Sequence, residues 1–374
     1  MRSLRVGSVL GFEIRLDYSW FIVFFLILWT FAAAVFPVQA PGRSPAVYLG
    51  MGLVGSVLFF ASLLAHEVSH SLVARARGIP MEGITLFVFG GMARTRAESR
   101  SPGDEFVIAG VGPLTSLGIA LVLGAVGWLG MRFGWSDVVV VVVLQLALLN
   151  LVLAIFNLLP GFPLDGGRLL RAAVWKLTGS VTRATRVAAS GGKGIGLLLI
   201  GLGIWQILTI NLLGGVWMIL IGAFLRTAAE SGYLQSLLSS TLAGVTVSEV
   251  MTPAPVTVSS DLSLEEFVDR FLLEGRHLGY PVVENGLPVG LVSLHGVRKI
   301  PRSEWSSRTV GAVMVPLTGR LTAGPDESMN QVLEKLTGAP TGRLLVLEDR
   351  RVAGIVTRSD LTRWLERARL LEGA

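Results

Sequence analysis

Residues 63–72 read LLAHEVSHSL, and they place two histidines and a glutamate directly after a long apolar run. Nearly every residue from Ala46 to Ala65 is apolar, and about 20 such residues suffice to cross a bilayer. Ionisable side chains are costly inside a membrane span, so those that occur there usually serve a function. The stretch therefore predicts a functional site at membrane depth.

The composition divides the chain into two regions. Of its 374 residues, 52% are hydrophobic and 16% are charged, and the mean hydropathy is +0.65. Residues 1–230 hold nearly all the long apolar runs, whereas residues 245–374 have the composition of a soluble domain. We predict a membrane domain over 1–230, a linker over 231–244 and a soluble domain over 245–374. Since the chain has no cysteine, a metal would have to be held by His, Asp, Glu or backbone oxygens.

The membrane domain is predicted to be a polytopic α-helical domain of about six spans. The first apolar segment could instead be a signal peptide ending near Val38-Gln39-Ala40, but Glu13 and Asp17 precede it and its apolar run is long. The last two segments are short and only Asn211 separates them. The predicted spans are Tyr18–Phe36, Ala46–Ala76, Phe106–Gly130, Val138–Pro160, Gly194–Ile210 and Leu212–Ala229.

The distribution of basic residues fixes the expected orientation. With both termini in the cytoplasm, the external loops contain only Arg43 and Arg132 as basic residues, in agreement with the positive-inside rule. The net charge of +6 is then a consequence of topology, and we expect no nucleic-acid partner. We predict a multi-pass protein of the cell membrane with both termini cytoplasmic. The basic residues on the cytoplasmic side are Arg2, Arg5, Arg15, Arg75, Arg77, Arg94, Arg96, Arg100, Arg168, Arg171, Lys176, Arg183, Arg186, Lys193 and Arg226.

The two histidines have the spacing of metal ligands. His66 and His70 are four residues apart, so on a helix they share one face with Cβ atoms about 5–6 Å apart. Glu67 points about 100° away and is free to act as a base. This is the HExxH pattern of zinc metalloproteases. In a soluble helix the pattern also arises by chance, but the cost of uncompensated His and Glu in a span favours a metal.

A third ligand is needed, because catalytic zinc usually takes three protein ligands and one water. His277 and His295 lie in the soluble region, so we expect a carboxylate from the membrane domain. Asp165 is the candidate, in the segment NLLPGFPLDGGR, whose Pro- and Gly-broken backbone is tolerated at membrane depth only where it is buried or lines a cavity. Asp137 lies in a predicted external loop and is set aside.

These motifs resemble the site-2 protease family of intramembrane zinc metalloproteases. The resemblance rests on HEVSH at 66–70, GPLTS at 112–116, NLLPGFPLDGG at 157–167 and the opening GFEIRLDYSWFIVFFL. It implies one zinc ion held by His66, His70 and Asp165, with Glu67 as general acid and base. The family often has Asn where this chain has Thr115 or Ser116.

The same resemblance gives a role to Asn157, eight residues before Asp165. It would bind the substrate carbonyl or the developing oxyanion; the alternative is a helix-to-helix hydrogen bond in the membrane. His66 lies roughly ten residues, or about 15 Å of helix, from the cytoplasmic Arg75 and Arg77, so the site should open towards the cytoplasm.

Residues 82–97, EGITLFVFGGMARTRA, predict a β-hairpin or reentrant β-element. The β-branched and aromatic run is broken by Gly90-Gly91 before a second short run. An open strand edge could capture an unwound substrate by β-addition, and the alternative is a cytoplasmic loop that dips into lipid. The connection is too short for an inserted PDZ domain, so the chain does not resemble the PDZ-bearing branch of the family.

The soluble region is an internal repeat with a period of about 64 residues. VSEVM at 247–251 matches VGAVM at 310–314, and Gly290 matches Gly354. Each half predicts a strand, an amphipathic helix (264–273 and 329–336), two strands and a final helix. The repeat resembles a tandem pair of CBS domains, an α/β fold, with modules at about 245–300 and 308–366. The resemblance implies regulation by an adenine nucleotide, ATP, ADP or AMP.

The two halves differ at the expected nucleotide site. The second half has Thr357-x-x-Asp360, whose carboxylate would hold ribose hydroxyls, whereas the first has Ser293-x-x-Gly296. A purely structural pair, or one that joins two chains as a homodimer, is the alternative.

The sequence as a whole predicts an intramembrane zinc endopeptidase that cleaves transmembrane segments of single-span membrane proteins under control of the CBS pair. The rival is a CBS-regulated ion channel or transporter that uses His66, Glu67, His70 and Asp165 as an ion site. A non-catalytic metal-binding scaffold is a second rival. A base between two ligands argues for hydrolysis, because a transport site has no need of it.

Overall fold

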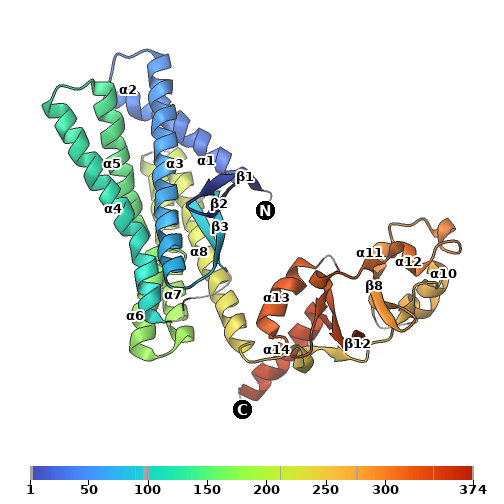
Figure 1. The fold of residues 1–374 in the computed structure, drawn as a ribbon. Helices are drawn as coiled ribbons and strands as arrows, with labels where there is room; N and C mark the ends of the chain where they lie inside the picture. The colour runs from blue at the N-terminus through green and yellow to red at the C-terminus, as the bar shows by residue number, and fades with distance from the viewer. Residues whose placement is uncertain are drawn as a thin grey trace. The chain divides into compact units, whose positions relative to one another are not determined.

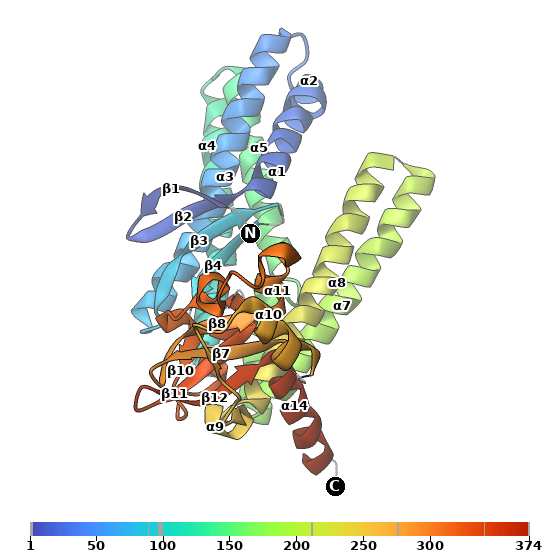
Figure 2. The same cartoon turned by 90° about the vertical axis from the view of Figure 1, so that its right-hand side faces the viewer.

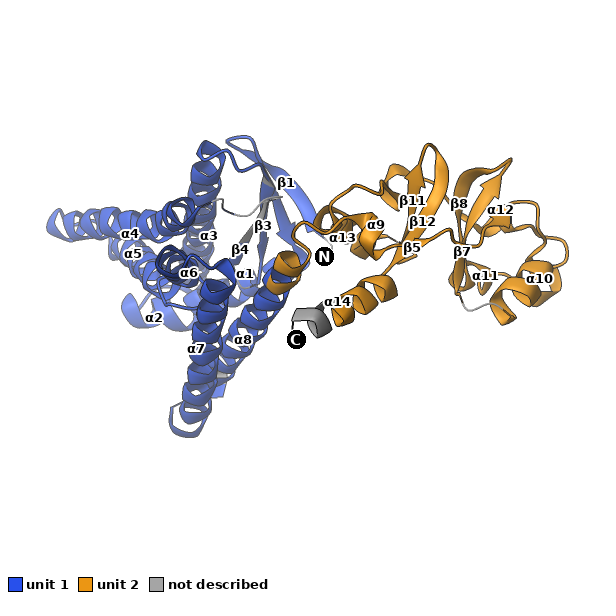
Figure 3. Cartoon of the chain, turned by 90° about the horizontal axis from the view of Figure 1, so that it is seen from below, with its two compact units in different colours: residues 1–236 blue, residues 237–374 orange. Residues whose placement is uncertain are grey.

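The computed structural model describes residues 3–88, 90–95, 99, 101–210, 212–274, 277–339 and 341–372. The chain forms two compact units, Met1–Ser236 and Leu237–Ala374 (Figure 3).

The first unit is built from long apolar helices and one small sheet (Figure 1). Its elements are β1 (Ser3–Val9), β2 (Phe12–Asp17), α1 (Tyr18–Thr30), the π-helical turn Phe31–Val35, α2 (Phe36–Gln39), α3 (Pro45–Ala76), β3 (Met81–Phe87), β4 (Gly90–Thr95), α4 (Pro102–Arg132), α5 (Asp137–Asn157), α6 (Asp165–Thr178), α7 (Val181–Thr209) and α8 (Leu212–Thr241).

The predicted helical membrane domain is confirmed. Among the described residues, five helices are long and apolar enough to cross a membrane: Tyr18–Gln39, α3, α4, α5 and α7. The sixth predicted span, Leu212–Ala229, lies within α8. The helix α7 starts at Val181, thirteen residues before the predicted span Gly194–Ile210, because its polar first turns continue the same helix. Figure 2 shows α7 and α8 as a helical hairpin.

The predicted β-element is a hairpin, and it belongs to a larger sheet. Strands β3 and β4 pair in antiparallel fashion, and the sheet order is β1-β2-β3-β4. The N-terminal strands β1 and β2 were not predicted; they form a hairpin whose second strand runs parallel to β3, with Ile14 opposite Ile84. Phe12, Ile14, Ile84 and Leu86 are buried against Val68 of α3, so the sheet is held on the helix that carries HEVSH.

The second unit consists of two similar modules. Its elements are α9 (Val247–Val250), β5 (Thr252–Pro253), β6 (Val258–Ser259), α10 (Leu264–Phe267) with the π-helical turns Val268–Leu273, β7 (Gly279–Glu284), β8 (Leu287–Ser293), α11 (Leu294–Val297), a 3-10 turn (Arg302–Glu304), α12 (Val310–Val313), β9 (Val315–Pro316), a 3-10 turn (Gly319–Leu321), β10 (Thr322–Ala323), α13 (Met329–Gly338), β11 (Arg343–Glu348), β12 (Arg351–Thr357) and α14 (Arg358–Glu372).

The modules exchange their edge strands. One sheet has the order β6-β7-β8-β9 and the other β10-β11-β12-β5, so β5 from the start of the first module completes the sheet of the second, and β9 does the reverse. The repeated pattern of strand, helix, two strands and helix is confirmed in both halves.

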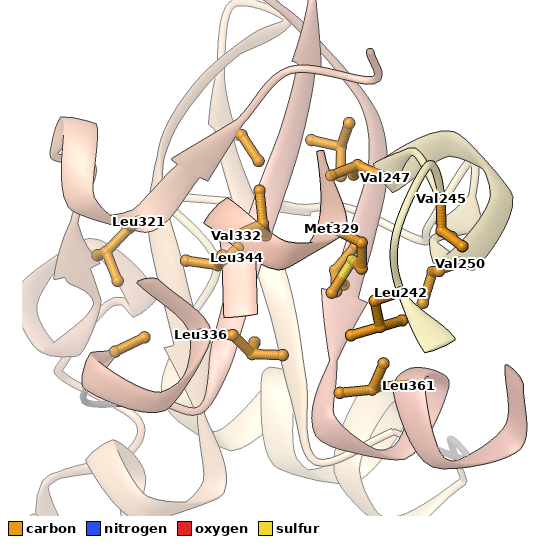
Figure 4. Packing of buried hydrophobic residues seen from close by; sticks show 14 residues of the cluster. Leu242, Val245, Val247, Val250, Leu321, Met329, Val332, Leu336, Leu344 and Leu361 are labelled. Carbon is orange, nitrogen blue, oxygen red and sulfur yellow. The ribbon is translucent and has the colours of Figure 1, made fainter. Parts of the chain in front are cut away.

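Most of the segment 231–244, which the sequence predicts to be a linker, is helical. The helix α8 continues through it as far as Thr241, and Leu242 is fully buried in the core of the second module (Figure 4). Val245, Val247 and Val250 belong to the same core, which also contains Leu336.

Candidate metal centre

The three predicted ligands converge in the first unit. The Nε2 atoms of His66 and His70 lie 3.2 Å apart, and each lies 3.1 Å from Oδ2 of Asp165. His66, His70 and Asp165 are 2%, 6% and 9% exposed, so the cluster is enclosed by protein. The structure thus brings together side chains from α3 and from the first residue of α6, about a hundred positions later in the sequence.

Helix α4 fixes the orientation of both imidazoles. His70 Nδ1 donates to the carbonyl oxygen of Ile108 at 2.6 Å, and His66 Nδ1 lies 2.9 Å from Ser116 Oγ. Because a carbonyl can only accept, the neutral His70 ring carries its proton on Nδ1 and turns an unprotonated Nε2 towards the cluster. Metal-bound histidines usually have an outer partner of this kind.

The geometry fits a metal ion. Zinc binds imidazole nitrogen and carboxylate oxygen at about 2.0–2.1 Å, which places tetrahedral ligand atoms about 3.3 Å apart, close to the spacing seen here. Gly112 of α4 keeps space beside the nitrogens, because a Cβ there would overlap His70 Nε2 and lie 2.7 Å from His66 Nε2. The two imidazoles and one carboxylate are a donor set that zinc accepts.

Asp165 reaches the cluster because its loop turns back tightly. Residues 158–164 connect α5 to α6, and Asp165 is the first helical residue. A Cβ on Gly166 would overlap the carbonyl oxygen of Leu158, so only glycine permits this close backbone approach. Close backbone packing therefore explains the glycine directly after Asp165, in the Pro- and Gly-rich segment from which Asp165 was predicted.

Glu67 lies beside the cluster, under the edge strand of the sheet. A Cβ on Gly91 of β4 would lie 2.5 Å from Cδ and 2.8 Å from Oε1 of Glu67. The strand backbone therefore passes directly over the carboxyl group. Glu67 is half-buried and is not one of the three residues whose ligand atoms converge.

The other polar residues that the sequence analysis weighed lie outside the three-ligand cluster. Asn157 ends α5, and its Nδ2 donates to the carbonyl oxygen of Leu153 at 3.0 Å, one turn back on its own helix. Asp137 pairs with Arg43 at 3.3 Å on an exposed surface, which agrees with setting it aside. His277 and His295 lie in the second unit.

In the second unit, Asp360 is buried among protein donors. Its Oδ2 accepts from the backbone N–H and the hydroxyl of Thr357, and its Oδ1 accepts from the hydroxyl of Thr252 at 2.8 Å and from Arg363. Burial raises the pKa of this carboxyl, but the hydrogen bonds from Thr357, Thr252 and Arg363 outweigh it and keep the pKa below its usual value. A ribose would have to displace one of these donors.

A cleft lies at the corresponding residues of the first module, and residues of the second module, Arg343 among them, complete its wall. It has a volume of about 540 Å³ and is lined by Ser293 and Gly296 together with the cationic Arg298, Lys299 and Arg343. The cations make this cleft suitable for an anionic ligand, although the sequence singled out the other half.

An enclosed His-His-Asp cluster beside a glutamate, in a unit whose helices include several that are long and apolar enough to cross a membrane, is typical of an intramembrane metalloprotease. The comparisons with known proteins agree, and the chain belongs to peptidase family M50, whose model matches residues 54–135 and 131–200. The CBS domain model matches residues 247–302 and 310–367, so the tandem CBS pair is confirmed.

Relatives match along nearly the whole chain. Rip3 of Mycobacterium tuberculosis is 37% identical over 372 residues, 99% of this chain and 94% of that protein. The zinc metalloprotease MJ0392 of Methanocaldococcus jannaschii is 30% identical over 369 residues, 96% of this chain and 95% of that protein. Among solved structures, a site-2 protease from the same organism is 29% identical, covers 62% of this chain and 95% of its own, and has a TM-score of 0.43.

Proposed function

We propose that this metalloprotease is a zinc endopeptidase that hydrolyses peptide bonds within transmembrane segments of other membrane proteins. One zinc ion per chain would be held by His66, His70 and Asp165. The observation that carries the proposal is the convergence of these three ligand atoms, 3.1–3.2 Å apart, where α3, a helix long and apolar enough to span a membrane, meets the first residue of α6.

When bound there, zinc would polarise the scissile carbonyl and make a water molecule more acidic. Glu67 would take the proton from the attacking water and return it to the leaving amine. Its position supports this role, because it is adjacent to His66 in sequence and lies outside the ligand set. The amide of Asn157 would donate to the substrate carbonyl in place of the Leu153 oxygen that accepts its hydrogen bond here.

The edge strand β4 supports a mode of substrate binding. One side of β4 pairs with β3, and among the described residues no further strand continues the sheet beyond it. An unwound substrate could add there as a fifth strand through backbone hydrogen bonds. Since Gly91 brings this strand against Glu67, the added strand would run beside the base.

The orientation and compartment follow from the same proposal. The excess of basic residues on one side favours cytoplasmic termini in the cell membrane. A site that opens to the cytoplasm would receive water and a single-span substrate from that side.

The CBS pair would regulate the protease by binding ATP, ADP or AMP, and it could also join two chains as a homodimer. Asp360 remains our candidate for binding the ribose, and the hydroxyl of Thr357 our candidate for binding the phosphate. The guanidinium of Arg363 is the donor that a ribose would most easily displace, because the Arg363 side chain is 63% exposed whereas that of Asp360 is 4% exposed.

One experiment tests the catalytic proposal. The purified chain in detergent is incubated with single-span membrane proteins, with and without a zinc chelator, beside the variant Glu67→Gln. We expect chelator-sensitive cleavage by the wild type, and no cleavage by Glu67→Gln although its zinc content stays near one per chain. Cleavage by Glu67→Gln would exclude this mechanism, and ion flux in vesicles without proteolysis would favour the transporter.

A further inference from the structure

Glu105 is a fully buried carboxylate in the membrane unit that the proposed chemistry does not use. It lies in the first turns of α4 and is 0% exposed. Arg171 donates from Nε to Glu105 Oε1 at 2.7 Å and adds a second contact through its other nitrogen, and Arg168 Nε lies 3.8 Å from the same oxygen. Within the described part of the chain, no hydrogen-bond partner reaches Oε2.

Both arginines belong to the helix that supplies the third ligand. They follow Asp165 by three and six residues on α6. The guanidinium of Arg171 also lies 5.4 Å from the ring centroid of Phe162, in the loop that leads to Asp165. This cluster therefore ties both α6 and the loop before it to α4.

The same face of α4 serves the other two ligands. Residues 105, 108, 112 and 116 are spaced by three, four and four positions, so they form one stripe along the helix. The carbonyl of Ile108 holds His70, the hydroxyl of Ser116 holds His66, and Gly112 leaves space beside both rings. Glu105 extends the stripe by one turn towards α6.

We propose that Glu105 is a positioning residue for the metal site: through Arg171 and Arg168 it holds α6 in the register that brings Asp165 to the two histidines. This inference rests on the proposed zinc site. Metal ligands must lie within a few tenths of an ångström of their ideal places. Asp165 begins its helix after a long turn, so a shift of α6 along α4 would remove its carboxylate from the cluster.

A charge pair can hold this register because it resists partial displacement. Separating the partners would leave a charge buried without compensation, which is far more costly than a loose apolar contact. The planar guanidinium of Arg171 meets the carboxylate through two nitrogens, so it fixes direction as well as distance.

A purely structural ion pair would give a different result from a positioning one. Loss of a structural pair lowers the stability of the protein equally with and without zinc. Loss of a positioning pair also reduces the stabilisation that zinc itself provides, because the stabilisation by a bound ligand rises with the logarithm of its affinity. Zinc affinity and the zinc-dependent shift in the unfolding midpoint therefore separate the two.

The test uses the full-length chain in detergent, stripped of metal and titrated with zinc against a competing chelator. Glu105→Gln keeps the size of the side chain and removes its charge. Glu230→Gln is the control, since Glu230 pairs with Lys193 at 3.3 Å between α7 and α8 and both side chains of this pair are exposed, unlike that of Glu105. Arg171→Lys keeps the charge but not the two-nitrogen contact, and it decides the question if Glu105→Gln does not fold.

We expect Glu105→Gln to weaken zinc binding by about 10- to 100-fold, as loss of an outer partner does in other metal sites. Arg171→Lys should weaken it as well, Glu230→Gln should match the wild type, and the zinc-dependent rise in the unfolding midpoint should shrink only in the first two. Wild-type zinc affinity in Glu105→Gln and Arg171→Lys would overturn the inference, as would an equal loss in Glu230→Gln. A wild type that binds no zinc would instead overturn the metal site itself.

Discussion

Gly91 and Glu67 are in direct contact although they lie on different elements, the edge strand β4 and the helix α3. A Cβ added to Gly91 would lie 2.5 Å from Cδ and 2.8 Å from Oε1 of Glu67. Separations this short are not found between unbonded heavy atoms, so a side chain at position 91 must displace the glutamate or the strand. The position of Glu67, the proposed base, therefore depends on the position of β4, the proposed substrate-binding edge.

The first prediction follows from this contact. Gly91→Ala should reduce cleavage by about a hundredfold, because a displacement of about 1 Å at a catalytic group can cost that much. Zinc content should stay near one per chain, since Glu67 is not among the clustered ligands. The control is Gly7→Ala on β1 of the same sheet, where nothing lies within 4 Å of the added carbon. Full activity in Gly91→Ala would mean that the strand moves away from Glu67 in the working enzyme.

The second prediction concerns the third ligand. Asp165→Ala should abolish cleavage and most zinc binding, because two imidazoles alone hold zinc weakly. Metal analysis of the purified variant measures this directly. Asp137→Ala is the control, since Asp137 pairs with the exposed Arg43. Asp137 begins α5, whereas the loop to Asp165 follows the other end of that helix. Full zinc occupancy in Asp165→Ala would show that another residue completes the site.

The three side chains that converge, His66, His70 and Asp165, could be singled out from the sequence because their local sequence context is unusual. HEVSH has the spacing of one helix face, and Asp165 stands in a segment whose Pro and Gly residues cannot continue a span. The structure explains the glycine after Asp165, since only glycine fits at position 166, where the backbone passes the carbonyl oxygen of Leu158. Spans and the repeat were predictable in the same way, from hydropathy and periodicity.

The residues that orient the ligands were not predictable in this way. Ile108 acts through its backbone carbonyl, which any residue would supply, and Gly112 acts through the absence of a side chain. Arg168 and Arg171 were counted only as cytoplasmic charges, although Glu105 pairs with both. The strands β1 and β2 were missed because the mixed polar and apolar residues before the first span resemble an ordinary polar lead, although β2 buries two of its side chains. Such contacts depend on which helices meet, and a single sequence does not encode that locally.

The third prediction concerns pH and the second unit. Because the folded pKa of Asp360 lies below its usual value, its carboxylate stabilises the fold above the unfolded pKa of about 3.9. That contribution is lost as the pH falls through the lower folded pKa. Asp360→Asn should therefore lower the free energy of unfolding near neutral pH by about 1–3 kcal/mol. The difference from the wild type should vanish at strongly acidic pH. Denaturant titrations of residues 237–374, which keep Leu242 in the core, measure both.

The last prediction locates the nucleotide. If Asp360 binds the ribose, Asp360→Asn removes charge-assisted hydrogen bonds worth about 1.5–3 kcal/mol. The variant should therefore bind the nucleotide about tenfold to a hundredfold more weakly. Calorimetric titration of residues 237–374 with ATP, ADP and AMP measures this, at a temperature where the variant remains folded. Arg298→Ser is the comparison, because Arg298 lines the cationic cleft of the first module and is exposed. Loss of binding in Arg298→Ser with none in Asp360→Asn would move the site to that cleft. No heat with any of the three nucleotides would leave the pair a structural or dimerising one.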